Sequence, residues 1–259
     1  MKKIYYAVIF LLISFNSFAG LYNSPGTGVN WTLSDLVANS NGSVTFDGTQ
    51  YLFIDSVYIR TNDVIRIETD AIVKFNPKVV FKINGSIIIN PPTNVLFSPA
   101  VPGTSFRGLW LDFSTNSIIN KLTYEYASSL RISDCSPIIS NSTLRYLTDS
   151  TVLANGAIAL QRSSPTITNC QFLNNYRLCV TGGANVANAP KIINCIFSGN
   201  NSSDQTGAHI NLGATGADTA KIIGCRIADP SGIKTGGIGF LPTGPVHVYI
   251  HGNYIANNR

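Results

Sequence analysis

Four residues in the second half of the chain have side chains that could bind a charged or stacked ligand. Lys191, Lys221 and Tyr249 hold the same position in three consecutive copies of an eight-residue repeat, and Arg226 follows Lys221 by five residues. Strands that stack in register lie about 5 Å apart, so the two lysines and the tyrosine would form a column suited to an anionic or stacked sugar chain. The same charges could instead simply keep an exposed sheet face soluble.

Five cysteines are an odd number, so they cannot all pair within the chain. Cys170, Cys195 and Cys225 share the sixth repeat position, and we expect them to stack in the core as small apolar side chains. A disulfide between two neighbours is geometrically possible. No C-x-x-C pair or nearby histidine supports a metal site, so no metal ligand is assigned. Alternation predicts that Cys179 faces outward, and Cys135 is expected in a turn.

Residues for acid–base or nucleophilic catalysis do not cluster. After residue 150 the chain has no Glu and three Asp residues, Asp204, Asp218 and Asp229. The repeat places all three in loops, whereas a glycosidase needs two opposed carboxylates. His209 is expected on the surface, and the spacing of His247 and His251 matches no Ser/His/Asp or Cys/His arrangement. The sequence therefore identifies no catalytic residue and no cofactor.

The composition is that of a folded, sparsely charged chain. Of 259 residues, 44% are hydrophobic and only 12% are charged, about half the usual charged share, which argues against extensive disorder. The formal net charge of +5 includes Lys2 and Lys3. Without these two, no Lys/Arg cluster of the kind that binds phosphate backbones remains, so we do not expect a nucleic acid partner.

The first 19 residues have the features of a secretory signal peptide. Lys2 and Lys3 precede an apolar run over residues 4–13, and the small residues Ser17 and Ala19 suit cleavage after Ala19. A membrane anchor would need about 20 apolar residues, so no membrane span is expected after signal removal. We therefore expect the protein to be secreted or held at the cell surface.

An internal repeat organises the second half. Five eight-residue segments align, with a weaker sixth copy before them, and they start at Ser117, Pro137, Pro165, Pro190, Ala220 and Val248. The third residue is always Ile, the eighth is large and apolar, and the fifth is Asn or Gly except for Lys121. A left-handed bend at the fifth residue, which Asn and Gly adopt cheaply, would let the third and eighth side chains face one interior.

Repeats of short strands cannot bury their apolar faces alone, so we expect them to stack as the coils of a parallel β-solenoid. Through units such as SPTITNCQF (164–172), the chain over roughly residues 55–259 resembles the right-handed parallel β-helix proteins of the pectin-lyase-like superfamily, of the exported bacterial type. The resemblance supplies the handedness of the coils, whereas the all-β fold class follows from the pattern of short strands itself. It also implies that Ca²⁺ would be a cofactor only if the chain were a lyase, because lyases of this family bind Ca²⁺ through acidic residues on an outward strand face.

Three parts are predicted along the chain: a signal peptide over 1–19, an N-terminal cap region over 20–54 and β-helix coils over 55–259. Within the cap, Thr32 and Asp35 suit the start of a short helix. Residues 255–259 match residues 172–176, where a further strand would begin. We therefore expect a monomer that continues beyond Arg259 into further coils or domains.

The expected function is that of an exported extracellular or cell-surface module. Such a module would be structural, adhesive or glycan-binding, with a polysaccharide or cell-surface glycan as its partner and no recognisable catalytic site. The alternative is a polysaccharide lyase or glycoside hydrolase. That alternative rests on the resemblance of fold alone.

Overall fold

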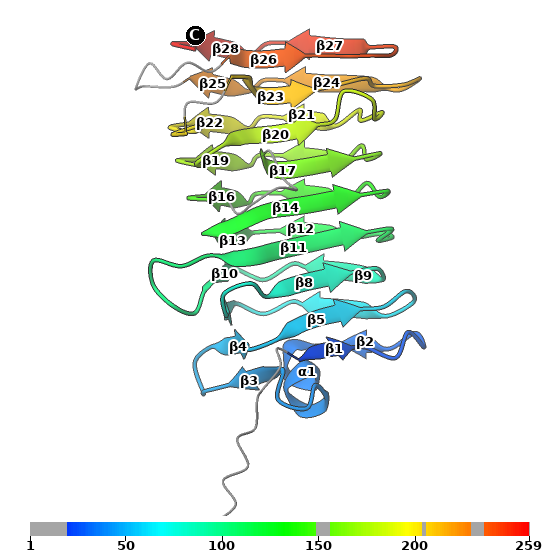
Figure 1. The fold of residues 1–259 in the computed structure, drawn as a ribbon, viewed down its shortest axis with the longest axis vertical. Coiled ribbons are helices and arrows are strands. Elements are labelled where there is room, and N and C mark those ends of the chain that lie inside the picture. Colours follow the sequence, from blue (N-terminus) through cyan, green and yellow to red (C-terminus); the bar gives the residue numbers. More distant parts are fainter. Residues whose placement is uncertain (1–19, 149–155, 204–205, 229–235, 259) are drawn as a thin grey trace, which may run out of the picture.

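The computed structural model describes residues 20–148, 156–203, 206–228 and 236–258, which wind into a stack of coils (Figure 1). The fold is a nearly all-β parallel β-helix in which each full coil contributes one strand to each of three sheets. The predicted signal peptide and the predicted loop positions Asp204 and Asp229 lie outside the described residues. None of the described segments forms a helix with the length and apolarity that a bilayer crossing requires.

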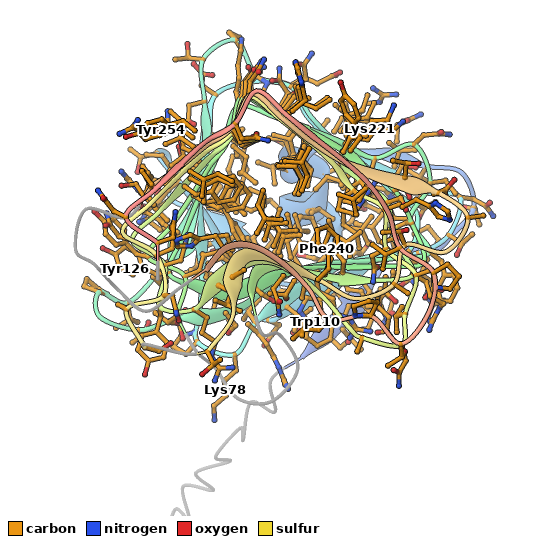
Figure 2. All side chains as sticks on the ribbon, turned by 90° about the horizontal axis from the view of Figure 1, so that it is seen from above. Lys78, Trp110, Tyr126, Lys221, Phe240 and Tyr254 are labelled. Atoms are coloured by element: carbon orange, nitrogen blue, oxygen red, sulfur yellow. The ribbon has the colours of Figure 1, made fainter. Side chains whose placement is uncertain are left out.

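The three sheets, here called A, B and C, enclose a triangular interior (Figure 2). In stacking order, sheet A contains β1 (Leu21–Asn23), β5 (Ser56–Ile59), β8 (Val80–Ile83), β11 (Phe106–Asp112), β14 (Ala127–Ser133), β17 (Gly156–Gln161), β20 (Leu178–Gly182), β23 (Ala208–Leu212) and β26 (Gly236–Phe240). Sheet B contains β2 (Asn30–Trp31), β6 (Val64–Ile67), β9 (Ser86–Ile89), β12 (Ile118–Asn120), β15 (Ile138–Ser140), β18 (Thr166–Thr168), β21 (Lys191–Ile193), β24 (Thr219–Ile223) and β27 (His247–His251). Sheet C contains β3 (Val44–Phe46), β4 (Tyr51–Phe53), β7 (Ala71–Phe75), β10 (Val95–Pro99), β13 (Leu122–Glu125), β16 (Thr143–Arg145), β19 (Gln171–Leu173), β22 (Ile196–Ser198), β25 (Arg226–Ala228) and β28 (Tyr254–Ala256).

The fifth repeat residue turns the chain from sheet B to sheet C, as predicted. Its φ angle is positive in every copy, at Lys121 (57°), Asn141 (48°), Asn169 (54°), Asn194 (53°), Gly224 (63°) and Gly252 (63°). The weak copy therefore bends like the others although Lys occupies the bend. The sixth residue reinforces the turn, because the side chains of Ser142 and Cys170 donate to the fourth-position carbonyls of their own copies, at 2.7 and 3.3 Å.

The third and eighth repeat residues face the interior together. Ile167 and Phe172 are fully buried, and the rings of Phe172 and Phe197 from adjacent coils stack at 4.7 Å. The equivalent Ile250 and Ile255 are 49% and 47% exposed because they belong to the last coil that the structure describes. This pattern confirms that the repeat columns form the core.

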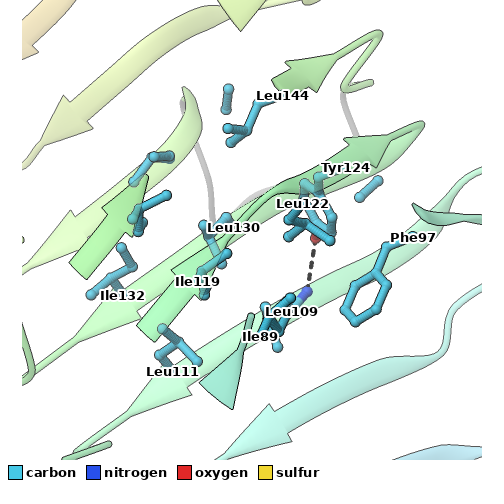
Figure 3. Packing of buried hydrophobic residues seen from close by; sticks show 14 of the residues in the cluster. Ile89, Phe97, Leu109, Leu111, Ile119, Leu122, Tyr124, Leu130, Ile132 and Leu144 are labelled. Carbon is cyan, nitrogen blue, oxygen red and sulfur yellow. Dashed lines mark hydrogen bonds between the residues drawn. The ribbon is translucent and has the colours of Figure 1, made fainter. Parts of the chain in front are cut away.

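In the front coils, the core includes one polar anchor (Figure 3). The hydroxyl of the fully buried Tyr124 accepts from the Leu109 backbone N–H at 2.8 Å and donates to the Ser129 carbonyl at 2.9 Å. These two bonds satisfy backbone groups at the point where β11 departs from regular alternation. Burial raises the pKa of Tyr124 far above its ordinary range, so the phenol stays protonated.

A capped first coil closes the front of the stack. The predicted short helix is α1 (Leu33–Asn39), and Thr32 and Asp35 form its capping box. Behind it, the buried Asp63 accepts from the backbone N–H groups of Gly26 and Val29, each at 2.9 Å, and from the Trp31 indole at 3.3 Å. Burial would raise the pKa of Asp63, but these hydrogen bonds outweigh it and hold the pKa below its usual range.

The outward placement predicted for Cys179 and His209 is wrong. Both side chains are fully buried, and Cys179 Sγ lies 3.7 Å from His209 Nδ1. At the start of several sheet A strands two consecutive residues face the interior, here Cys179 with Val180 and His209 with Ile210. The strands enter sheet A through a bend, so strict alternation assigns the wrong face to the first of the two.

Candidate functional site

The structure groups three of the four predicted ligand-binding residues. Lys191, Lys221 and Tyr249 are register neighbours on the outward face of sheet B. Arg226 lies on sheet C instead, because the bend at position 224 separates the two faces, and its guanidinium Cζ lies 4.6 Å from the centroid of the Tyr254 ring. Figure 2 shows Lys221 and Tyr254 on different sides of the coil. The predicted column therefore exists, without Arg226.

A denser cluster of aromatic and cationic side chains occupies the outward face of sheet A in the front coils. One column runs across four consecutive strands, with Tyr58 paired to Lys82, Lys82 to Trp110, and Trp110 to Arg131. We call these four residues, together with Arg107 and Asp112, the Trp110 cluster. Figure 2 shows Trp110 pointing away from the core on this face.

Cations and rings alternate in contact along the Trp110 cluster. Lys82 Nζ lies 5.4 Å from the centroid of the Tyr58 ring. The guanidinium carbons of Arg131 and Arg107 lie 5.1 and 5.7 Å from the Trp110 ring. These separations are within the range of cation–π attraction, so each basic side chain is held near an aromatic ring of the same face.

Asp112 forms ion pairs with cations of the preceding and the following coil. Its carboxylate Oδ2 lies 3.2 Å from Lys82 Nζ and its Oδ1 lies 3.7 Å from Arg131 Nε. The residue is only 7% exposed because the two cations cover it. With Arg107 included, the cations outnumber this carboxylate by two, which leaves the face attractive to anions.

A glycine break in β11 explains why Trp110 faces outward. Gly108 has a φ of 126°, and a Cβ atom there would collide with the Ser129 carbonyl oxygen. Gly108 and Leu109 are both buried, so the alternation shifts by one residue between Arg107 and Trp110. Both of these side chains consequently reach the same outer face, which strict alternation would forbid.

The same column changes character in the later coils. Beyond Arg131 the register passes through small or polar residues, in the order Ala159, Thr181, Asn211 and Gly239. A hollow of about 280 Å³ lies here, lined in part by Ala159, Gln161, Thr181 and Asn211. The outward column of sheet A therefore carries basic and aromatic side chains in the front coils and small or polar side chains beside a shallow hollow in the later coils.

The carboxylates near the Trp110 cluster are held by cations. One coil further on, Asp134 accepts from Arg162 Nη2 at 2.7 Å, and this pairing keeps the pKa of Asp134 below its usual range. A glycosidase acid needs the opposite, a carboxyl with a raised pKa facing a second carboxylate. Asp218 is exposed in the turn before β24, as predicted. Across the described parts of the chain, no three His, Cys, Asp or Glu side chains come together as a metal site.

Cys170, Cys195 and Cys225 are buried in the core, as the packing interpretation of the ladder predicts. Hydrogen bonding to Cys170, together with burial, raises the pKa of Cys195 to about 12. Cys135 lies in the connection between β14 and β15, and burial raises its pKa to about 11. A thiol that stays protonated and buried is chemically inert, so Cys135 and Cys195 act as packing residues, whereas the hydrogen bond with Cys195 lowers the pKa of Cys170.

The sequence indicates the strand that carries Trp110 but not the cluster around it. Trp110 stands between Leu109 and Leu111, and an apolar pair with this spacing predicts a strand whose middle residue faces outward. An outward Trp next to Arg is the available signal. The coil alignment that brings Lys82 and Arg131 beside it could not be obtained, because the front coils lack the eight-residue repeat.

Comparisons with protein-family models, with curated proteins and with solved structures give no match for this chain. The functional argument therefore rests on the geometry of the site. The combination of a partly exposed indole, three cations and an ordered sheet face is suited to binding, and the paired carboxylates give no support to acid–base catalysis.

Proposed function

We propose that the protein is an exported β-helix module, of the pectin-lyase-like and bacterial type, that binds an anionic polysaccharide along the outward face of sheet A. The observation that carries this proposal is that the Trp110 ring lies in cation–π contact with both Arg107 and Arg131. An indole face offers an apolar surface to a sugar ring, and the guanidinium groups beside it can pair with carboxylate or sulfate groups in bidentate fashion.

The spacing of the coils supports a polymer rather than a small ligand. Successive strands lie about 4.8 Å apart, which is comparable to the length of one sugar residue in an extended chain. Lys82, Trp110 and Arg131 therefore present one group per coil to successive residues of a polymer. The shallow half beyond Arg131 would leave room for the chain to continue.

The column Lys191, Lys221 and Tyr249 on sheet B is a weaker second candidate for the same class of ligand. Tyr249 stacks on His251 at 5.9 Å, but the two lysines have no aromatic partner comparable to Trp110 among the contacts of the described residues. The enzyme alternative, with Ca²⁺ as a possible cofactor, stays a prediction without a supporting site. Export likewise stays a proposal, and N-terminal sequencing of the mature protein should find Gly20 first.

Affinity electrophoresis with polygalacturonate, alginate and a neutral glucan tests the binding proposal. We expect migration to be retarded by at least one anionic polymer, and the retardation to weaken as salt rises because the contacts are partly exposed. Trp110→Ala should abolish the retardation, whereas Lys191→Ala should leave it unchanged. A Trp110→Ala variant that the anionic polymer retards as strongly as the wild type, or retardation by that polymer that does not weaken with salt, would contradict the proposal.

A further inference from the structure

The corner where sheet C turns into sheet A contains two tyrosines in an unusual backbone conformation. Tyr126 and Tyr146 both have a φ of 54°. The equivalent bends of later coils are occupied by Asn174 (52°), Gly199 (66°) and Asn257 (56°). Asn and Gly adopt this region readily, whereas a bulky side chain there is uncommon. The bend itself therefore does not call for tyrosine.

The two rings do not stabilise the core either. They stack on each other at 5.2 Å and 16°, and the residues are 38% and 37% exposed. Figure 2 shows Tyr126 at the rim of the coil, away from the interior. Backbone strain combined with an exposed aromatic surface is a feature that concentrates at ligand sites.

A cavity lies directly against Tyr126. Its volume is about 270 Å³, and it is lined by Lys74, Ser98, Pro99, Gly103, Glu125 and Tyr126, among others. The connection after β10 forms one wall and the Tyr126 ring another. We call this cavity the corner pocket. It lies at the small end of the range for ligand sites, which suits a single sugar residue and not a polymer segment.

Hydrogen bonds within the protein hold the two charged side chains of the corner pocket in place. Lys74 Nζ donates to Ser98 Oγ at 2.8 Å, and Glu125 Oε2 accepts from Arg145 Nε at 2.8 Å. Arg145 is in turn held against the Tyr146 ring, with its Cζ 5.7 Å from the centroid. The Tyr146 ring thus contacts Arg145, and Arg145 in turn orients the Glu125 carboxylate. Lys74 keeps donors and Glu125 keeps acceptor sites for a ligand.

We propose that the corner pocket binds one neutral sugar residue, with the sugar ring against Tyr126 and its hydroxyls on Lys74 and Glu125. Each hydroxyl both donates and accepts, so adjacent hydroxyls match a donor and an acceptor placed side by side. The lining of the corner pocket carries one cation and one carboxylate, Lys74 and Glu125, so it lacks the excess of cations found in the Trp110 cluster. The proposal is independent of the anionic site on sheet A.

The chain itself suggests the sharpest test, the variant Tyr126→Asn. Asn174 shows that Asn fits this bend, so the variant removes the ring without disturbing the coil. Isothermal titration and saturation-transfer NMR would use lactose, maltotriose, cellotriose, mannotriose and diacetylchitobiose as probes. We expect the wild-type protein to bind at least one of them, and Tyr126→Asn to lose at least tenfold in affinity while its thermal midpoint stays equal or rises.

Matched controls separate the two sites. Tyr126→Phe keeps the ring and should retain binding, and Trp110→Ala should retain neutral-sugar binding even where it abolishes binding of the anionic polymer. Failure of the wild-type protein to bind any of the five saccharides would overturn the proposal. So would a Tyr126→Asn variant that binds as well as the wild type.

Discussion

The two halves of the coil stack divide their roles. In the later coils the repeat is close: the interior Ile192 and Cys195 are matched by Ile222 and Cys225, and the bend residue Asn194 by Gly224. The outward column of sheet A there carries only small or polar side chains. In the front coils the interior departs from the repeat, and the same outward column carries the Trp110 cluster. Packing constrains the inward positions of every coil, whereas the outward positions can differ, so the proposed binding cluster lies where the repeat is least regular.

The largest effect is expected from a charge in the regular interior. Ile192→Asp should prevent folding, because an unpaired carboxylate would be buried between two coils. The adjacent Ile193 faces outward, so Ile193→Asp is the matched control and should remain soluble. Thermal unfolding followed by circular dichroism measures both. A soluble Ile192→Asp variant with an unchanged midpoint would show that the columns are assigned wrongly.

In the front coils, the buried carboxylate of Asp63, which binds backbone groups of the cap region, should matter most. Asp63→Asn should cost about 3 kcal/mol in the free energy of unfolding, because backbone donors lose a charged acceptor. Since the pKa of Asp63 is lowered by folding, its contribution is complete above about pH 4 and is lost as the pH falls through the folded value. Chemical denaturation at pH 7 and pH 3 should therefore show a smaller deficit for the variant at pH 3.

The exposed Asp47→Asn serves as the control for the loss of a lowered-pKa carboxylate outside the coil stack. It should change the unfolding free energy far less than Asp63→Asn does. If Asp63→Asn lowers the unfolding free energy equally at both pH values, the Asp63 carboxylate does not contribute through a lowered pKa in the folded protein.

A comparison of the sheet A and sheet B faces tests where ligand affinity lies. Arg131→Ala should raise the dissociation constant for the anionic polymer about tenfold, or about 1.4 kcal/mol, because it removes both a cation and the contact to Trp110. Lys221→Ala on sheet B should change it less than twofold. A larger effect of Lys221→Ala than of Arg131→Ala would show that the polymer binds to the column Lys191, Lys221 and Tyr249 on sheet B.

The smallest effect concerns the bends. Asn169→Val should cost about 1 kcal/mol or more, because a β-branched residue is forced into the left-handed region. Asn169→Gly should be nearly neutral at the same position. Equal stability of the two variants in a denaturant titration would place the strain elsewhere.

Much of the fold was predictable because the repeat reports the packing directly. The Ile column, the left-handed bends and the buried cysteine ladder all follow from residue types at constant positions. The prediction failed for Cys179 and His209, because a strand that enters its sheet through a bend buries two consecutive residues. Strict period-two reasoning contains no information about such a bend.

The sequence by itself determined that the chain is a stack of strand-based coils, since inward Ile and bend-forming Asn recur with a spacing that only such a stack satisfies. Tertiary structure alone decided which outward side chains meet. Lys82, Trp110 and Arg131 are more than 20 residues apart from one another in sequence, and coil lengths vary, so only the register of adjacent strands brings them together. The same register places Lys74 near Glu125 beside Tyr126, where the chain pattern alone indicates no pocket.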